Sequence, residues 1–468
     1  MSEQIVNRSA VDLAAAIRSG ELSSVEVVNA HLDRIDDVNP RVNAIIAMRD
    51  RADVLADATA ADASDPVGPL HGLPVAVKDL EHVAGLPTRS GSTVTSDRPQ
   101  PADGHVAAQL RRAGAVIVGK TNTPEFGTGS HTFNEVHGVT RNPWNLDRSA
   151  GGSSGGAAAA LAARMLPIAD GSDFGGSLRN PAAFCNVVGL RPSIGRVAEP
   201  SIRSAHLLRL GVRGPMGRTV ADTALVLSAL AGPHPADPNS LTDDPASFRE
   251  PLPSSTDARI AWAGDMGGMF TCEPEVLELC EATARRVEGL GGSFGAAVPD
   301  MADSMMVFRT LRGMSYRDLG AQLGADAFER VKGTVQENIV FGRGLGADDV
   351  LAAEIARAEL HRRMTAFWAD YDVVALPAAQ VAPFPANWEF PTEIDGVAMD
   401  DYLEWMTTCC VITPTGCPAI SIPAGFTSAG LPVGLQLVAP FGQDRRLLEV
   451  AAALESRELA DRTPTFDR

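Results

Sequence analysis

Apolar and polar positions along the chain follow two periods, and segments of the two kinds alternate. Short apolar runs bounded by turn residues predict buried strands at 73–77, 115–119, 260–263, 293–298 and 373–377. Between them, apolar residues at helical spacing predict helices at 104–113, 219–231, 275–290 and 348–368. Strands that alternate with helices predict an α/β fold, an α/β/α sandwich whose central sheet is covered by helices on both faces.

Local signals refine this picture at both ends of the chain. The pattern Ser23-Ser24-Val25-Glu26 is a capping box that opens a helix to about residue 38, and the Pro at 40 is expected to end it. Two apolar runs at 419–423 and 432–438 enclose a Gly/Pro turn and predict a strand pair, so the large sheet is expected to be mixed. A last helix is expected at 447–459. We predict one domain over 1–468, with a variable, mainly helical region at 233–391.

Most of the candidate catalytic residues lie in the segment 150–192. Two glycine-framed serine clusters, 151–156 and 171–177, are separated by a small-residue helix and a short apolar strand. Glycine lets the backbone approach a ligand closely, and Gly175 and Gly176 leave the N–H groups before Ser177 uncovered. That arrangement suits a serine nucleophile with its own oxyanion hole. Two tight turns in a flexible connection are the alternative interpretation.

A lysine changes the balance between these interpretations. Of 40 basic residues only three are lysines, and Lys78 ends the apolar strand GLPVAVKDL. Burial lowers the pKa of a lysine, which can then act as a base, whereas arginine keeps its proton. Asp79 would oppose that shift if it pointed the same way. A second serine, Ser153, can pass the proton of Ser177 to Lys78.

These motifs resemble those of a known family. The segment GGSSGG, then GSDFGGSLRNPAAFC with 24 residues from Ser153 to Ser177, then GLRPS, is similar to the amidase signature family of serine hydrolases. GLPVAVKD, GKTNTPEFG, NPWN, GPMGRTVAD and GCPAISIPAGF resemble further blocks of that family. The resemblance covers most of the chain and is weakest from about 233 to 391. Asn186 departs from it, because the family usually has glycine there.

The resemblance implies a role for each matched residue. Ser177 would be the acyl-enzyme nucleophile, Ser153 a bridging serine after a cis peptide bond, and Lys78 the base. Ser154 would support the site by hydrogen bonding, and Asp173 and Arg179 would pair to brace the loop. The oxyanion hole would use the backbone N–H groups of Phe174, Gly175, Gly176 and Ser177. The implied reaction is hydrolysis of a carboxylic amide through an acyl-enzyme.

Two other interpretations compete with this one. The segment Gly151–Gly155 satisfies G-x-S-x-G, the nucleophile elbow of α/β-hydrolases, but we read loop before it and the last histidine, His361, lies far from the end. A phosphate-binding module is the second alternative, but the segment lacks the lysine of a P-loop and no G-x-G-x-x-G follows a strand. A degenerate member acting as a scaffold is disfavoured by the intact Lys78, Ser153 and Ser177.

Composition narrows the partners. The net charge of −18 argues against a nucleic-acid or anionic-membrane surface. The six cysteines form no CxxC pair, and no HExxH occurs, so we expect no metal and no cofactor. Without a basic start followed by an apolar run, or 18 consecutive apolar residues, we expect a cytoplasmic protein. The expected partner is a small-molecule amide, ester or carbamate, with a homodimer left open.

The segment before the PAISIP block bears on the class of substrate. The family's glutamine-hydrolysing amidotransferase subunit carries an acidic residue shortly before the PAISIP block, where this chain has Trp405 and Met406. We therefore expect an apolar or aryl amide; the alternatives are a carbamate or ester hydrolase and the glutamine-hydrolysing subunit. Core packing is the competing interpretation of Trp405. The expected substrate-binding residues are Thr128, Gly129, Ser130, Trp405 and Ile412, with further walls from 301–345 and 388–390.

Overall fold

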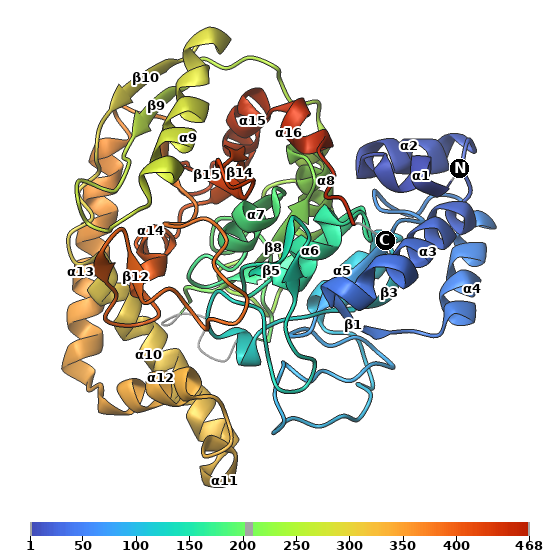
Figure 1. Cartoon of the computed structure of the whole chain (residues 1–468), viewed down its shortest axis with the longest axis horizontal. Helices are drawn as coiled ribbons and strands as arrows, with labels where there is room; N and C mark the ends of the chain where they lie inside the picture. Colours follow the sequence, from blue (N-terminus) through green and yellow to red (C-terminus); the bar gives the residue numbers. More distant parts are fainter. Residues whose placement is uncertain (1, 202–208, 467–468) are drawn as a thin grey trace.

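The computed structural model describes residues 2–201 and 209–466. Its core is an eight-stranded mixed sheet in the order β10-β9-β11-β15-β14-β7-β8-β6, with a separate three-stranded sheet β1-β3-β2 near the N-terminal helices (Figure 1). The strands of these two sheets are β1 (Ile45–Met48), β2 (Pro74–Lys78), β3 (Val116–Thr121), β6 (Ile168–Asp173), β7 (Val188–Arg191), β8 (Val212–Gly217), β9 (Arg259–Trp262), β10 (Ser293–Ala296), β11 (Val373–Pro377), β14 (Ala419–Phe426) and β15 (Pro432–Val438).

Helices surround this sheet and fill the connections. They are α1 (Ser2–Asn7), α2 (Ala10–Ser19), α3 (Ser24–Val42), α4 (Arg51–Asp62), α5 (His105–Arg112), α6 (Gly155–Ala162), α7 (Arg179–Cys185), α8 (Val220–Leu230), α9 (Pro274–Arg285), α10 (Ser304–Leu323), α11 (Ala325–Phe328), α12 (Gly333–Gly344), α13 (Ala347–Phe367), α14 (Thr407–Cys410), α15 (Asp444–Leu454) and α16 (Arg457–Asp461). Helices α10, α12 and α13 stand together on one side of the molecule, and α1–α4 on the other (Figure 1).

The sheet is buried on both faces, as predicted. Along β15 the side chains alternate: Gln436 hydrogen-bonds to Arg179 of α7, whereas Leu435 and Leu437 join the apolar cluster that also contains residues of α8, α9 and α15. Strands β9, β10 and β11 run parallel to one another, and the remaining pairs of this sheet are antiparallel. The fold is therefore the expected α/β sandwich with a mixed sheet.

Several local predictions need correction. The capping box at Ser23 and Glu26 is present, but the helix runs through Pro40 to Val42, because Asn43 in the left-handed region caps it. The expected final helix is two helices, α15 and α16, separated at Glu455 and Ser456. The residue pattern at 401–408 also predicts a helix, but the structure has a 3₁₀ turn at Glu404–Met406 followed by α14.

The chain around the serine clusters contains elements that the pattern does not predict. Helix α7 and strands β7 and β8 follow the second cluster and carry the chain through the central sheet. Strand β5 (Asn145–Ser149) occupies the segment before the first cluster, where the sequence predicts loop. It pairs with β4 (Arg141–Asn142) in a ribbon outside the central sheet and forms one antiparallel bridge from Arg148 to Pro385, so it does not supply the strand of a nucleophile elbow.

The C-terminal end of the described chain packs against an N-terminal helix. The ring of Phe466 lies 5.5 Å from the Arg34 guanidinium and 5.1 Å from that of Arg41, which places the end of the described chain against α3.

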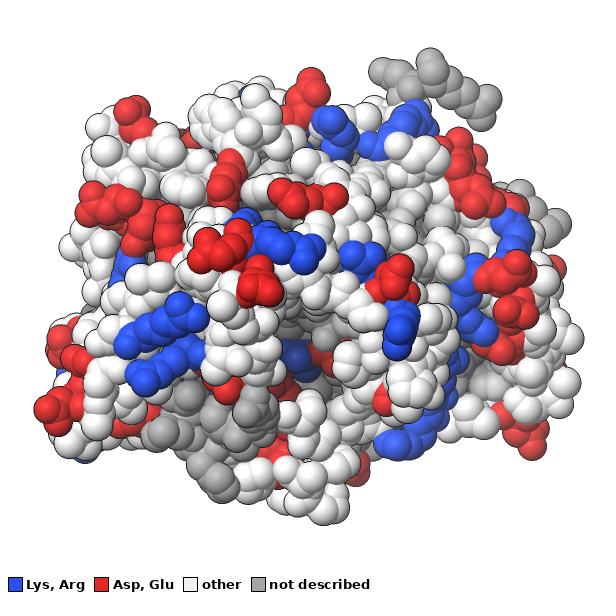
Figure 2. Space-filling model, turned by 90° about the horizontal axis from the view of Figure 1, so that it is seen from below, with Lys and Arg blue, Asp and Glu red and all other residues white. Residues whose placement is uncertain are grey.

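The face drawn in Figure 2 is hollowed near its centre and carries basic and acidic side chains around the opening. Among the described residues, no helix is long and apolar enough to span a bilayer.

The contact between β15 and α7 yields a stability prediction. A Cβ at Gly434 would lie 2.6 Å from the Cβ and 2.7 Å from the Cα of Ala183. We expect Gly434→Ala to destabilise the protein by about 1–3 kcal/mol through overpacking. Gly344→Ala is the matched control, because nothing lies within 4 Å of a Cβ there. Thermal unfolding of both variants checks this, and equal midpoints would contradict it.

Candidate active site

The Lys78 amine lies at the centre of the site and is surrounded by hydroxyl groups. Its Nζ donates to the Oγ atoms of Ser153 at 2.7 Å, Ser154 at 2.8 Å and Ser172 at 3.0 Å. The side chain is 1% exposed, at the end of the fully buried strand β2. Ser153 and Ser154 come from the loop before α6, where the Gly152–Ser153 peptide bond is cis, and Ser172 comes from β6. The sequence pattern does not single out Ser172.

Burial and a nearby cation determine the protonation of Lys78. Burial lowers its pKa to about 7, and the charge of Arg213 acts in the same direction. Asp79 does not oppose the shift, because its Oδ1 pairs with Nζ of Lys120 at 2.7 Å. The carboxylate of Asp170 partly counteracts the lowering. A substantial fraction of neutral amine is therefore present at neutral pH.

Asp170 is a second residue of the site that the sequence pattern does not identify. The backbone N–H of Lys78 donates to its Oδ1 at 3.0 Å, and its Oδ2 has no hydrogen-bond partner among the described residues. Burial raises the pKa of Asp170 to about 7. Asp170 and Ser172 are two residues apart on β6 and both reach Lys78, which the period of a strand explains.

Asp173 holds the second serine cluster in place. Its carboxylate accepts two hydrogen bonds from Arg179, at 2.8 and 2.9 Å, and one from Arg191 at 3.3 Å. It also accepts from the backbone N–H groups of Gly176 at 2.9 Å and Leu178 at 3.1 Å. Burial alone would raise the pKa of Asp173, but these partners hold it well below its usual range. The expected pairing of Asp173 with Arg179 is present.

The loop from Phe174 to Ser177 differs from the expectation at one position. The backbone N–H of Gly176 donates to the Asp173 carboxylate. Of the four expected oxyanion-hole donors, only the N–H groups of Phe174, Gly175 and Ser177 therefore have no hydrogen-bond acceptor among the described residues. A Cβ at Gly175 would lie 2.9 Å from the Phe308 ring, and Gly176 has φ +113°. Both positions therefore require glycine.

Ser177 borders a cavity of about 300 Å³. Its side chain makes no hydrogen bond to another described residue, and its backbone carbonyl accepts from the N–H of Ser154 at 3.2 Å, which ties the two serine clusters together. The cavity is lined by Leu80, Phe126, Gly127, Ser153, Ser172, Asp173, Phe174, Ser177, Gly211, Val212, Arg213, Arg312, Ser315, Tyr316 and Leu319. Most of the non-serine side chains in this lining are apolar or aromatic.

Thr128, Gly129 and Ser130, three of the expected substrate-binding residues, are absent from the lining of this cavity. Thr128 bonds to the hydroxyl of Tyr316 at 2.7 Å, and Ser130 accepts from Asn180 at 3.0 Å. Gly129 lies near the Lys332 amine. The preceding residues, Phe126 and Gly127, form the wall instead.

Trp405 and Ile412 are core residues, and this corrects their placement in the pocket. Trp405 is 1% exposed and contacts the rings of Phe184 and Phe384, with centroids 6.3 and 5.3 Å apart. Ile412, also 1% exposed, lies in the main apolar core. Trp388 borders a different cavity beside Pro385 and Glu393. Helix α10 does supply a wall, as expected for the 301–345 region.

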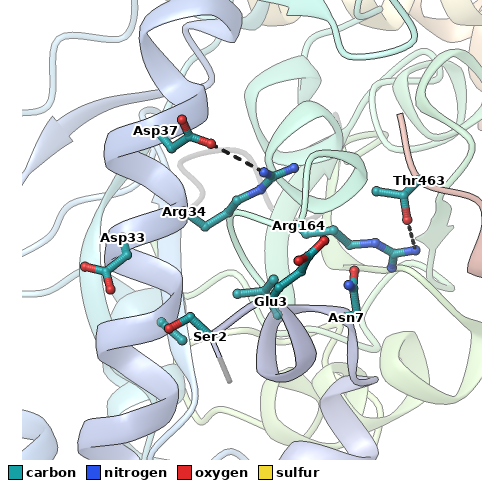
Figure 3. A pocket seen from close by; sticks show the side chains of 10 residues that line it. Ser2, Glu3, Asn7, Asp33, Arg34, Asp37, Arg164 and Thr463 are labelled. Carbon is teal, nitrogen blue, oxygen red and sulfur yellow. Dashed lines mark hydrogen bonds and ion pairs between the residues drawn. The ribbon is translucent and has the colours of Figure 1, made fainter. Parts of the chain in front are cut away.

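A separate cavity of about 330 Å³ lies between α1 and α3 (Figure 3). Its labelled side chains include Glu3, Asp33, Arg34 and Arg164, with Arg34 paired to Asp37. Within its described lining, the hydroxyl-bearing residues are Ser2 and Thr463, and there is no lysine. The cavity at Ser177 is therefore the better candidate for acyl transfer.

Comparison with known proteins identifies the family of the chain. A family model described as Amidase matches residues 26–448. The chain belongs to the amidase signature family. It is 37% identical to the acylamidase of Rhodococcus erythropolis, over 99% of this chain and 98% of that one. A glutamyl-tRNA(Gln) amidotransferase subunit from Thermus thermophilus is 36% identical, over 95% of this chain and 96% of that one.

Solved structures support the same assignment. A bacterial aryl acylamidase of the amidase signature family superposes with a TM-score of 0.87 at 26% identity, covering 97% of this chain and 98% of that one. This amidase signature protein is thus an enzyme of the class that hydrolyses carbon–nitrogen bonds of amides. Among the described residues, no cluster of His, Cys, Asp or Glu could hold a metal ion.

The bracing of Asp173 can be tested through stability. Arg179→Ala leaves a buried carboxylate with one cation fewer, so we expect a loss of about 3–5 kcal/mol. Arg362→Ala is the control, because that arginine forms an exposed pair with Glu359 on α13 and its removal costs about 0.5 kcal/mol or less. Urea unfolding measures both. Similar losses in the two variants would exclude a bracing role for Arg179.

Proposed function

We propose that this amidase hydrolyses apolar or aryl carboxylic amides to an acid and an amine or ammonia, through an acyl-enzyme on Ser177. The observation that carries the proposal is the buried Lys78 amine, which is hydrogen-bonded to Ser153 and has a pKa near 7, beside a cavity bordered by Ser177. A serine becomes nucleophilic when a base takes its proton, and a neutral buried lysine is such a base.

In the first step, neutral Lys78 accepts a proton from Ser153 while Ser153 takes the proton of Ser177. The Oγ of Ser177 forms a bond to the amide carbonyl carbon, and the carbonyl oxygen becomes an oxyanion. The free backbone N–H groups of the loop from Phe174 to Ser177 are available to stabilise it. Ser154 and Ser172 keep the amine oriented, because each holds a hydrogen bond to Nζ.

In the second step, the oxyanion collapses and the carbon–nitrogen bond breaks. The proton held by Lys78 returns through Ser153 to the departing nitrogen, which leaves as a neutral amine. Water then attacks the ester on Ser177, with its proton again passing to Lys78. The acid leaves, and Ser177 recovers its hydrogen.

The lining of the cavity supports an apolar or aryl substrate. Leu80, Phe126, Phe174, Val212 and Leu319 border the space next to Ser177. The relative named acylamidase and the solved aryl acylamidase point the same way. The same acyl-enzyme steps would hydrolyse esters and carbamates, and activity on these substrates stays a prediction.

A glutamine-hydrolysing subunit is the second candidate, because one relative at 36% identity is named as part of a glutamyl-tRNA(Gln) amidotransferase. The position at which we expect its acidic residue holds Trp405 and Met406, and both are buried in an apolar cluster. The apolar amide therefore remains the favoured substrate.

We also infer a cytoplasmic location, in keeping with six buried free thiols. The homodimer stays a prediction.

The nucleophile assignment predicts a large kinetic effect. We expect Ser177→Ala to lower kcat for a p-nitroanilide by about 10⁴-fold or more, because no acyl-enzyme can form. Ser315→Ala is the matched control: Ser315 borders the same cavity, but within the described part of the chain its hydroxyl bonds only to the carbonyl of Leu311. Release of p-nitroaniline measures both, and activity near wild type in Ser177→Ala would refute the assignment.

The base assignment predicts the pH dependence. Only neutral Lys78 accepts a proton, so kcat/KM should rise with pH and level off above a midpoint near pH 7. Asp170→Asn removes a carboxylate that raises the pKa of Lys78, so the midpoint should move to lower pH. Asp97→Asn, at an exposed position, should leave it in place. A rate that falls with rising pH would contradict the role of Lys78.

A further inference from the structure

The cavity contains an arginine whose charge has no carboxylate partner among the described residues. Arg312 on α10 borders the cavity and is 5% exposed. Its hydrogen bonds within the described residues all come from Nη2, which donates to the hydroxyls of Tyr316 at 2.9 Å and Tyr402 at 2.8 Å. Its Nε is buried without a hydrogen-bond partner. A buried guanidinium in this state is costly unless something pairs with it.

The other arginine that borders the cavity differs in this respect. Arg213 forms ion pairs with Glu81 and Glu199, so its charge is compensated by the protein. The buried arginines Arg179 of α7 and Arg191 of β7 pair with Asp173. Arg312 therefore differs from these three arginines. Its positive charge lies beside the catalytic cavity, and no acidic side chain among the described residues pairs with it.

The surroundings of Arg312 hold it rigidly and leave Nη1 without a hydrogen-bond partner among the described residues. Its guanidinium lies 4.6 Å from the ring centroid of Tyr316 and 5.3 Å from that of Phe174. Those contacts fix the plane of the group, and the Tyr316 hydroxyl is itself bonded to Thr128. Tyr402 is likewise fixed, by a 2.7 Å hydrogen bond from Asn338. A prepositioned fork of N–H donors suits a planar anion.

Phe174 links this arginine to the reacting centre. Its ring lies beside the guanidinium, and its backbone opens the loop that ends at Ser177. A substrate acylating Ser177 would lie in the same cavity as Arg312. A purely structural arginine would explain the bonds to the two tyrosines, but those bonds use one nitrogen and leave Nε and Nη1 unused.

We propose that Arg312 is a specificity-determining residue that binds a carboxylate on the substrate, so that the preferred substrates are amides with an apolar body and an anionic end. This inference rests on the proposed amidase function and makes its substrate class narrower. The carboxylate supplies the missing partner of the buried guanidinium, and the apolar lining holds the chain or ring that joins it to the scissile amide.

Matched substrates test the proposal. The p-nitroanilides of succinic, glutaric and adipic acid would be compared with those of butyric, pentanoic and hexanoic acid, and N-butyryl-4-aminobenzoate with butyranilide. At the best chain length, or with the carboxylate on the amine side, we expect wild-type kcat/KM to favour the charged member by about tenfold or more. Arg312→Gln should remove this preference, with a larger loss of kcat/KM for the charged member than for the neutral member of each pair.

The controls separate this proposal from the amidase function. Arg317→Gln, an arginine on the same helix outside the cavity lining, should keep the preference. Hydrolysis of the neutral anilides that is lost in Ser177→Ala supports the amidase function alone. Equal rates for charged and neutral substrates in the wild type, or equal losses in Arg312→Gln, would overturn the role of Arg312.

Binding gives a readout that does not depend on turnover. Monoanilides of the same diacids would be titrated calorimetrically into Ser177→Ala and into the double variant Ser177→Ala/Arg312→Gln. We expect about tenfold or more weaker binding to the double variant for the charged ligands only. Absence of any difference would overturn the proposal even if no anilide is hydrolysed.

Discussion

Removal of the Lys78 amine from water is the constraint on which the candidate site depends. An ammonium ion is strongly hydrated, and at this buried position the hydrogen-bond partners of the amine among the described residues are three hydroxyl groups. Hydroxyl groups serve either protonation state, because they accept from an ammonium and donate to a neutral amine. Three serines from one loop and one strand must therefore converge on one nitrogen atom. The glycines around them are needed because the backbones approach closely: a Cβ at Gly171 would lie 2.7 Å from the Ser154 Oγ.

The second requirement is a rigid loop ahead of Ser177. Asp173 collects two arginine side chains and two backbone N–H groups, so its carboxylate determines the path of the chain from β6 into α7. Arg179 also bonds to Gln436 at 2.6 Å, which connects this loop to the middle of the central sheet. The position of the nucleophile is thus linked to the most buried part of the fold, while the opposite wall comes from α10, outside the sheet.

Local patterns were sufficient for much of the fold and for the centre of the site. The sequence predicts strands β11 and β15 at their observed bounds, because each is a mainly apolar run with a proline at one end. Lys78, Ser153 and Ser154 meet as expected. Strand β8 was missed because Gly214, Pro215 and Gly217 hide its apolar period.

Other features depend on contacts between distant segments, which no local pattern contains. Pro40 lies in the last turn of α3, where the helix continues for two more residues because Asn43 and its neighbours pack against the 137–139 loop. Trp405 is core because Phe184, more than 200 positions earlier in the chain, lies beside it. The use of the Gly176 N–H by Asp173 and the exposure of Arg312 to the cavity follow from three-dimensional packing alone.

The lysine content has a practical consequence for handling the enzyme. Lys78 and Lys120 are 1% and 0% exposed, and the Lys332 side chain is 18% exposed with its amine donating to the carbonyl of Thr128 at 2.6 Å. Two of the three lysines of the chain are therefore buried, and the amine of the third is bonded to a loop beside the site. Acylating dyes, aldehyde cross-linkers and amine-reactive supports find no freely exposed lysine on such a surface. Arginine- or carboxylate-directed coupling suits this protein, and slow modification by an amine reagent would report on the opening of the site.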